Sequence, residues 1–270
     1  MKRNFALIPR RKIPFLLALL TILAGFSGLV GWYLQMPALY TFLSHGASMK
    51  FNTALFITIL GLSLFLATEE KRTAASVLCS LVLLFSTLTL AEHLLNIDFK
   101  IDQLLVIDTF TDAKEEHPGR MSAFTAFAFF LTTMGFEFAL FKKYVWGQLI
   151  LTVALLAIYA AFVGILFNIN GLFTFGQYSS IALPTSIGLL SATLGCLSCT
   201  AHQGWLREIF SEYSAAVTAR YAVLSFFLIL PVFAGLLSLM LAKTDVSPGF
   251  AIVVLVTGFA ALSYQLPFLY

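Results

Sequence analysis

The twenty residues MSAFTAFAFFLTTMGFEFAL, Met121 to Leu140, contain one ionisable side chain, Glu137, among apolar, hydroxyl-bearing and glycine residues. A helix needs an apolar run of about 20 residues to cross the hydrocarbon core of a bilayer. The stretch therefore predicts a transmembrane helix, and similar runs follow one another along the chain.

The composition of the whole chain supports a membrane protein. Of its 270 residues, 60% are apolar and only 11% are charged. Soluble domains carry roughly 25% charged residues, and a soluble chain of this composition would expose large apolar patches. We therefore expect a polytopic membrane protein that lies in the lipid bilayer as a single transmembrane domain over 1–270.

Apolar runs between charged or glycine- and proline-rich breaks predict an all-α bundle of eight transmembrane helices. The first run follows five basic residues but is too long for the roughly 7–15-residue apolar core of a signal peptide, so we expect it to be retained. The predicted spans are 13–33, 51–67, 75–94, 122–141, 147–167, 181–200, 220–241 and 249–268.

The placement of lysine and arginine predicts the orientation of the bundle. With the N-terminus inside, the inner segments hold eleven of the sixteen basic residues and the outer segments hold five. Because cytoplasmic loops are enriched in these residues, both termini are expected in the cytoplasm. In a bacterium this would be the inner membrane, and the outer segments would face the periplasm.

A short signature recurs where the even-numbered spans begin. MKFNTA starts at Met49, MSAFTA starts at Met121, and a degraded copy, IALPTS, starts at Ile181. Two spans per copy predict three parallel two-helix repeats followed by a fourth, divergent pair. Met and Thr four residues apart share a helix face, so the signature serves either helix packing or contact with a ligand.

The outer segments mix apolar and polar residues. The apolar spacing within Asn96 to Phe110 predicts an amphipathic helix or strand-turn on the outer surface, with its acids facing water. The segments 36–46 and 171–180 would be the matching pieces. They either anchor the bundle at the membrane interface or roof a cavity between the helices.

Ionisable residues near the outer ends of the spans raise the question of a cofactor. His45, His93 and His117 are all predicted on the outer face, and imidazole binds metals and haem. No two of them have i, i+4 spacing and there is no CxxCH. We expect interfacial capping or pH sensing and no cofactor, with haem as the alternative. The CLSC pair, Cys196 and Cys199, has metal or redox spacing but lies within a span, which favours packing.

Two features are predicted on the inner side. Glu137 is expected to pair with Lys143 or to reach the inner interface, and a buried acid could also relay protons. The stretch 202–221 has an apolar stripe beside charged residues, which predicts an amphipathic helix on the cytoplasmic surface. No phosphate loop, GxSxG, HExxH or DNA-binding pattern is present. The chain is therefore not expected to be an enzyme or to bind nucleic acid.

Several of these stretches resemble a known family. SMKFNTALFITILGLSLFL, LLNIDFKIDQLL and HPGRMSAFTAFAFFLTTMGFEFAL are similar to the multi-pass N-terminal sensor region of bacterial PAS-containing histidine kinases and diguanylate cyclases. That pattern has an IDxxIDQLLF-like outer segment, then PGRM, and then TA at the start of the next span. The matching residues are Ile97, Asp98, Ile101, Asp102, Gln103, Leu104, Leu105, Pro118, Gly119, Arg120, Met121, Thr125 and Ala126.

The resemblance implies an input module for signal transduction, as in two-component systems. Such a module would detect a periplasmic or membrane-soluble stimulus and relay it through the last span to a cytoplasmic kinase or cyclase. The sequence ends after the eighth predicted span, so we expect the effector either in a longer chain or as a separate subunit. The module would act as a monomer or a homodimer.

Two other functions stay open at this stage. A small transporter or channel could be built from parallel repeats, although it would require polar residues or broken helices at mid-membrane. A structural or cofactor-holding subunit of a membrane complex would fit the 28 phenylalanines.

The expected ligand-binding site is the outer mouth of the bundle, where polar residues from several segments should meet. No catalytic residue and no metal ligand is assigned. The candidate residues are Thr53, Glu92, His93, Asp98, Asp102, Gln103, His117, Arg120, Met121 and Thr125.

Overall fold

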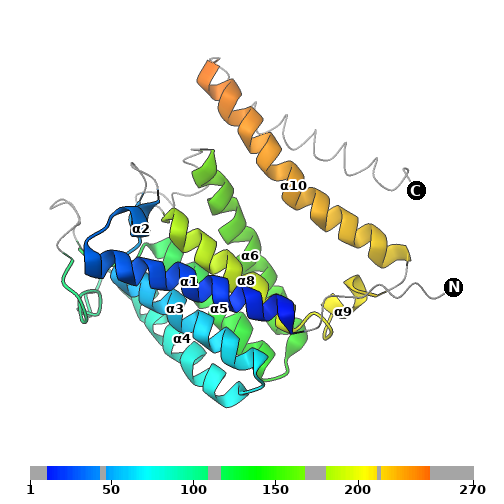
Figure 1. Ribbon diagram of the computed structural model, residues 1–270, viewed down its shortest axis with the longest axis horizontal. Coiled ribbons are helices and arrows are strands. Elements are labelled where there is room, and N and C mark those ends of the chain that lie inside the picture. The colour runs from blue at the N-terminus through cyan, green and yellow to red at the C-terminus, as the bar shows by residue number, and fades with distance from the viewer. Residues whose placement is uncertain (1–10, 43–46, 109–116, 168–180, 212–213, 244–270) are drawn as a thin grey trace.

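The computed structural model describes residues 11–42, 47–108, 117–167, 181–211 and 214–243. The regular structure in these ranges is α-helical (Figure 1). The helices are α1 (Lys12–Leu34), α2 (Ala38–Thr41), α3 (Phe51–Thr68), α4 (Arg72–Leu95), α5 (Ala123–Leu140), α6 (Tyr144–Leu166), α8 (Leu183–Cys199), α9 (Leu206–Ile209) and α10 (Ser214–Lys243).

Helices lie where seven of the eight apolar runs predict them. Most begin and end within three residues of the predicted bounds, because a segment in lipid must satisfy its backbone hydrogen bonds internally. α10 begins six residues before the predicted 220. The eighth predicted span, 249–268, lies outside the described residues.

Five helices are long and apolar enough to cross a membrane, namely α1, α3, α4, α5 and α6. α8 is also apolar but has 17 residues. The chain is therefore a multi-pass helical membrane protein.

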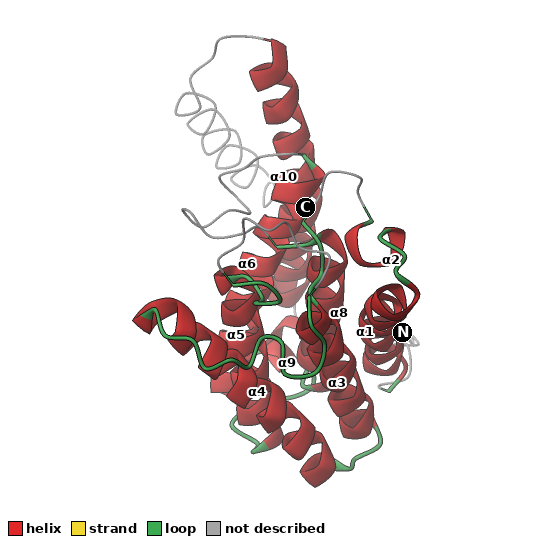
Figure 2. Ribbon diagram, turned by 90° about the vertical axis from the view of Figure 1, so that its left-hand side faces the viewer, coloured by secondary structure: helices red, strands yellow, loops and turns green. Residues whose placement is uncertain are grey.

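The helices α1, α3, α4, α5, α6 and α8 form one bundle (Figures 1 and 2). α3 packs against α1, α4 and α8, and α5 packs against α4, α6 and α8. Three-residue connections join α3 to α4 and α5 to α6 as antiparallel neighbours, as the short predicted connections require. We call the end that carries α2, the 96–108 loop and the N-termini of α3, α5 and α8 the α2 end. The opposite end is the α9 end.

Small residues bring α1 and α3 into close contact. A Cβ atom at Gly25 would lie 2.6 Å from the backbone nitrogen of Thr58 and 2.7 Å from the carbonyl oxygen of Ala54. The Thr58 hydroxyl donates to that same carbonyl at 2.9 Å, which satisfies it within its own helix. Helices in membranes pack closely through such residues, because apolar side chains gain little by leaving lipid.

α10 lies to one side of the bundle and extends beyond it in Figure 2. It contacts α6 through Tyr159, whose ring lies 4.6 Å from that of Phe227 and whose hydroxyl donates to the Phe227 carbonyl. Its Leu228 and Val232 side chains are exposed. These apolar side chains are suited to contact with lipid.

The predicted cytoplasmic helix over 202–221 is wrong. The structure has the four-residue α9 and then the start of α10 at Ser214. Gly204 has a positive φ of 54°, which interrupts a right-handed helix. The buried Gln148 of α6 holds this turn, because its amide donates to the carbonyls of Thr200 and Gln203, both at 2.9 Å.

Glu137 does not pair with Lys143 in the structure. Its carboxylate accepts hydrogen bonds from Ser76 at 2.7 Å and Ser80 at 2.9 Å, both on α4. Cys196 and Cys199 are free thiols. Glu137 thus joins α5 to α4 near the α9 end.

We predict that Gly25→Val destabilises the protein by about 1–3 kcal/mol, the usual cost of overpacking. The valine would force α1 away from the backbone of α3. Thermal unfolding in detergent measures the effect. Leu23→Phe is the control, because Leu23 on the same helix is 62% exposed and the larger ring can extend into lipid. Equal melting temperatures for the two variants would contradict the prediction.

Candidate functional site

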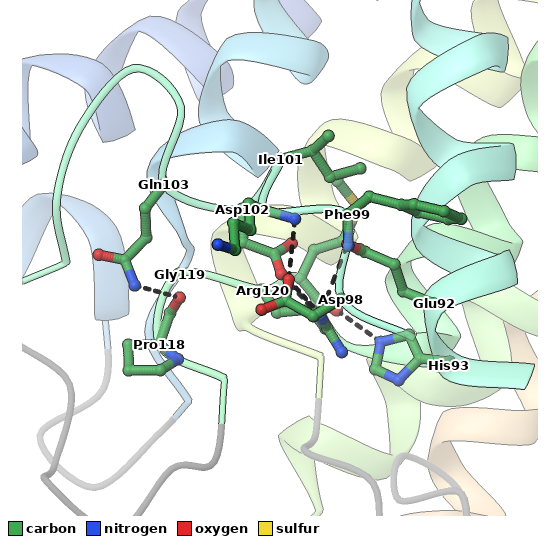
Figure 3. Close-up of polar contacts among 12 residues, drawn as sticks. Glu92, His93, Asp98, Phe99, Ile101, Asp102, Gln103, Pro118, Gly119 and Arg120 are labelled. Carbon is green, nitrogen blue, oxygen red and sulfur yellow. Dashed lines mark hydrogen bonds and ion pairs between the residues drawn. The ribbon is translucent and has the colours of Figure 1, made fainter. Parts of the chain in front are cut away.

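Arg120 is buried at the α2 end among three carboxylates (Figure 3). Its Nε lies 2.7 Å from Oδ2 of Asp102. Its Nη2 lies 3.3 Å from Oδ1 of Asp98 and 3.5 Å from Oε1 of Glu92. A buried guanidinium is tolerated only when paired and hydrogen-bonded, so these acids are the condition for its burial. Arg120, Glu92, Asp98 and Asp102 form what we call the Arg120 cluster.

The 96–108 loop, which supplies two of these acids, contains no helix. Asn96 and Lys100 have left-handed φ values of 54° and 58°, which break a helix. The predicted amphipathic helix is therefore wrong and the strand-turn alternative is nearer the structure. The acids do not all face water, since the side chains of Asp102 and Asp108 are only 10% and 2% exposed. Apolar side chains are exposed instead, namely Ile97, Phe99, Leu104, Leu105 and Ile107.

Further polar contacts fix the loop to the helix starts. Oδ2 of Asp108 lies 3.3 Å from Nζ of Lys50 and accepts from the backbone N–H of Gly119 at 3.1 Å. The side-chain amide of Asn52 donates to the carbonyl of Asp102 at 2.6 Å. The loop is thus held against both α3 and the start of α5.

Gln103, His93 and His117 make hydrogen bonds with backbone atoms in the same region. The Gln103 amide donates to the carbonyl of Pro118 at 3.0 Å. Nε2 of His93 lies 3.0 Å from the carbonyl oxygen of Met121, and the His117 carbonyl accepts from the N–H of Arg120. His45 lies outside the described residues.

The Arg120 cluster contains the one group of possible metal ligands that lie close together in the described part of the chain. Oxygens of Glu92, Asp98 and Asp102 all lie within 4.8 Å of one another. The guanidinium of Arg120 contacts all three, so it already supplies the cation that these acids require. We therefore assign no metal here.

Burial and charge shift two pKa values in the loop region. Desolvation raises the pKa of Asp102, and the hydrogen bond and charge of Arg120 oppose that rise only in part. Asp102 therefore takes up a proton at a higher pH than an exposed aspartate does. Burial, assisted by the charge of Asp108, raises the pKa of Tyr40 in α2.

A pocket of about 80 Å³ lies beside the Arg120 cluster, between the N-termini of three helices. This volume exceeds the roughly 10–15 Å³ that one water molecule requires. Each helix contributes its N-cap residue and the third residue that follows it. These are Lys50 and Thr53 of α3, Ser122 and Thr125 of α5, and Ala182 and Thr185 of α8. Arg120, Met49 and Met121 also line the pocket.

The structure gathers the candidate residues into two adjoining groups. Thr53, Met121 and Thr125 line the pocket, and Arg120 belongs to both the pocket and the Arg120 cluster. The remaining candidates either supply the carboxylates of the cluster or hold the backbone beside it. These are Glu92, His93, Asp98, Asp102, Gln103 and His117.

Sequence reasoning missed several residues of this region, among them Lys50, Asp108, Ser122 and Thr185. The recurring signature contained the signal for three of them. Lys50 and Ser122 directly follow its Met in the first two copies, and Thr185 is its Thr in the third. The pairing of Asp108 with Lys50 joins residues 58 positions apart, and no local pattern indicates it.

Comparisons with protein family models, with curated proteins and with solved structures give no match. The site therefore has to be interpreted from its own geometry and chemistry.

We predict that Arg120→Ala releases the 96–108 loop and lowers stability by about 3–5 kcal/mol. Its loss leaves three carboxylates facing one another without a counter-ion, of which Glu92 is buried and Asp102 is only 10% exposed. Thermal unfolding and limited proteolysis of the loop measure the two effects.

Arg207→Ala is the matched control for this prediction. Arg207 pairs with Glu208 at 3.4 Å, but both side chains are well over half exposed, and exposed pairs contribute little. We expect the control to behave as wild type. A loop that stays protected in Arg120→Ala would show that the Arg120 cluster does not hold it.

Proposed function

We propose that the protein is a membrane-embedded sensory module of a bacterial signalling protein. It would bind a small periplasmic or membrane-soluble ligand at the α2 end and relay the event to a cytoplasmic histidine kinase or diguanylate cyclase. The observation that supports this proposal is the pocket formed by the N-cap and third residues of α3, α5 and α8. The resemblance of the loop and helix-start motifs to bacterial sensor regions agrees with it.

The position of the pocket suits a sensor, because a ligand there would contact three bundle helices at once. α3 and α8 pack against α1, and α5 packs against α4 and α6. A ligand shifts a conformational equilibrium only when it binds one state better than another. Two states that differ slightly in the spacing of these three helix ends would bind a ligand differently. Because the helices are rigid, a shift at the α2 end would also move their α9 ends.

A finer topology belongs to this proposal. Both termini would be cytoplasmic, with eight spans in the inner membrane, and the chain would act as a monomer or homodimer with its effector in cis or as a separate subunit. The Lys and Arg distribution supports the orientation. Three parallel repeats and a divergent fourth pair are supported by Thr53, Thr125 and Thr185, which occupy equivalent signature positions and line one pocket.

A transporter or channel is less well supported by the geometry. Transporters use broken helices and polar groups at mid-membrane. α3, α5 and α6 run unbroken in the structure, and hydroxyls such as those of Thr58, Thr133 and Thr152 bond to carbonyls of their own helices. The polar pocket lies at the N-terminal ends of α3, α5 and α8 instead.

The sensory role is tested by fusing the C-terminus to the catalytic module of a diguanylate cyclase and measuring the cyclic dinucleotide in a bacterial host. We predict that Thr185→Leu, which fills the pocket, changes output at least about threefold. A threefold change requires a shift of less than about 1 kcal/mol between the two signalling states, and a larger side chain between three helix ends should cause at least that shift. Leu194→Phe is the control, because Leu194 lies on the same helix and is 39% exposed. Unchanged output at equal membrane levels of Thr185→Leu would count against the pocket as the sensory input.

The topology is tested with reporter fusions. We predict that a green fluorescent protein after Tyr270 fluoresces and that alkaline phosphatase there is inactive, because both termini would be cytoplasmic. The same reporters after Leu105 should give the opposite result. An active phosphatase after Tyr270 would exclude an even number of spans with the N-terminus inside.

A further inference from the structure

The helix ends at the pocket present backbone N–H groups without partners. In α3 the first bond within the helix runs from Ala54 to Lys50, and in α8 it runs from Ser186 to Ala182, each at 3.0 Å. No side chain caps either helix. The N–H groups of Phe51, Asn52 and Thr53 in α3 make no hydrogen bond to any residue that the structure describes. The same holds for Leu183 and Thr185 in α8, where Pro184 has no N–H. Helix N-termini carry partial positive charge, and ends buried without caps need water or a ligand.

α5 differs from these two helices in one respect. The hydroxyl of Ser122 accepts from the N–H of Thr125 at 3.2 Å, so this helix carries its own cap. The two uncapped ends, those of α3 and α8, therefore account for most of the unmet donor capacity at the pocket.

Two hydroxyls in the pocket are also without partners. Thr53 and Thr185 are 2% and 1% exposed, and neither side chain makes a hydrogen bond within the described ranges. In contrast, Thr193 of α8 donates to the carbonyl of Leu189 at 2.7 Å. The carbonyl one turn before Thr53 is that of Met49, which already accepts from Nε1 of Trp32 at 2.8 Å. Both residues line the pocket, where their hydroxyls can donate to a ligand.

The charged side chains that line the pocket are cationic. Lys50 and Arg120 line it, and no acidic residue of the described chain does. Arg120 uses Nε and Nη2 for the Arg120 cluster, and its Nη1 makes no hydrogen bond to any described residue. The acids lie behind the two cations and hold them in place, which lowers the entropy lost when a ligand binds. Because the four acids Glu92, Asp98, Asp102 and Asp108 outnumber these two cations, the net charge does not attract an anion. The hydrogen-bond donors must therefore supply the affinity.

The rest of the wall combines the hydroxyl residues Ser48, Ser122 and Thr125 with an apolar side. Met49 and Met121 are almost completely buried beside the hydroxyls, and Ala47 and Ala182 complete this side. Thioether side chains adapt to small aliphatic groups. A ligand with an anionic head and a short apolar tail matches this wall better than a bare inorganic anion does.

We propose that this pocket binds the carboxylate of a small aliphatic acid, with its oxygens directed to Thr53, Thr185 and Arg120 and its tail to the two methionines. The assignment names the ligand class of the proposed sensory site, and it rests on the proposed function only for its role in signalling. The same head group could come from a short-chain acid in the outer medium or from a fatty acid in the bilayer.

Binding is measured on the full chain in phosphatidylcholine nanodiscs with radiolabelled butyrate. We expect saturable binding to one site per chain. Thr53→Val and Thr185→Val should each weaken binding by about tenfold, the loss expected for one hydrogen bond to a charged group. Valine has nearly the shape of threonine, and neither hydroxyl has a partner in the described part of the chain. Both variants should therefore fold, which the melting temperature checks.

Thr152→Val is the matched control. Thr152 lies on α6 outside the pocket, and its hydroxyl donates to the carbonyl of Gln148 within its own helix. This variant should bind butyrate as wild type does. Equal binding by all three valine variants, or no saturable binding, would overturn the proposal.

Three competitor probes identify the class and source of the ligand. Displacement of butyrate by oleate, abolished by Thr185→Val, supports the carboxylate and adds the bilayer as a source. Failure of oleate to compete supports the free acid. Inorganic phosphate or tetramethylammonium competing as well as unlabelled butyrate would overturn the carboxylate assignment.

The sensory role can fail separately from this assignment. Butyrate that binds but leaves the output of the cyclase fusion unchanged would contradict the proposed function and leave the ligand class intact. If the chain binds no butyrate but pocket variants still alter output, the ligand class is contradicted and the proposed function stands.

Discussion

The guanidinium of Arg120 is buried at one end of an apolar bundle, where an unpaired cation would be strongly destabilising. Its neutralisation by Glu92, Asp98 and Asp102 joins the end of α4, the 96–108 loop and the start of α5. The loop turns inward because its acids are drawn to that charge. The same inward turn places Arg120 beside the N-termini that surround the pocket, so the pocket depends on this pairing.

The hydroxyl side chains of the bundle differ in their hydrogen bonds according to their position along a helix. Within the helices, residues such as Thr58 and Thr193 satisfy their hydroxyls on carbonyls one turn earlier and leave smooth surfaces for packing. At the start of α3 that option is lost, because the carbonyl one turn before Thr53 already accepts from Trp32. Among the described residues, the hydroxyls of Thr53 and Thr185 make no hydrogen bond, and both residues line the pocket.

The sequence predicts the helices well and the loop poorly, and the reason is physical. In lipid, length and apolarity nearly determine a helix, so the runs that became α3 and α5 were located to within a residue or so. The acids of the loop were expected to face water because periodicity considers only one segment. Their counter-ion, Arg120, lies 18 and 22 residues further along the chain. Thr185 was left out of the site because Ile181 replaces Met in its copy of the signature.

Two of the helices that border the pocket are shorter than the helices that follow them in the chain. α3 and α5 have 18 residues, whereas their partners α4 and α6 have 24 and 23. Each pair is level at the α9 end, where three residues connect its members. At 1.5 Å per residue the longer helices therefore extend roughly 8 Å beyond the shorter ones at the α2 end. The N-termini of α3 and α5 that border the pocket therefore lie below the ends of α4 and α6.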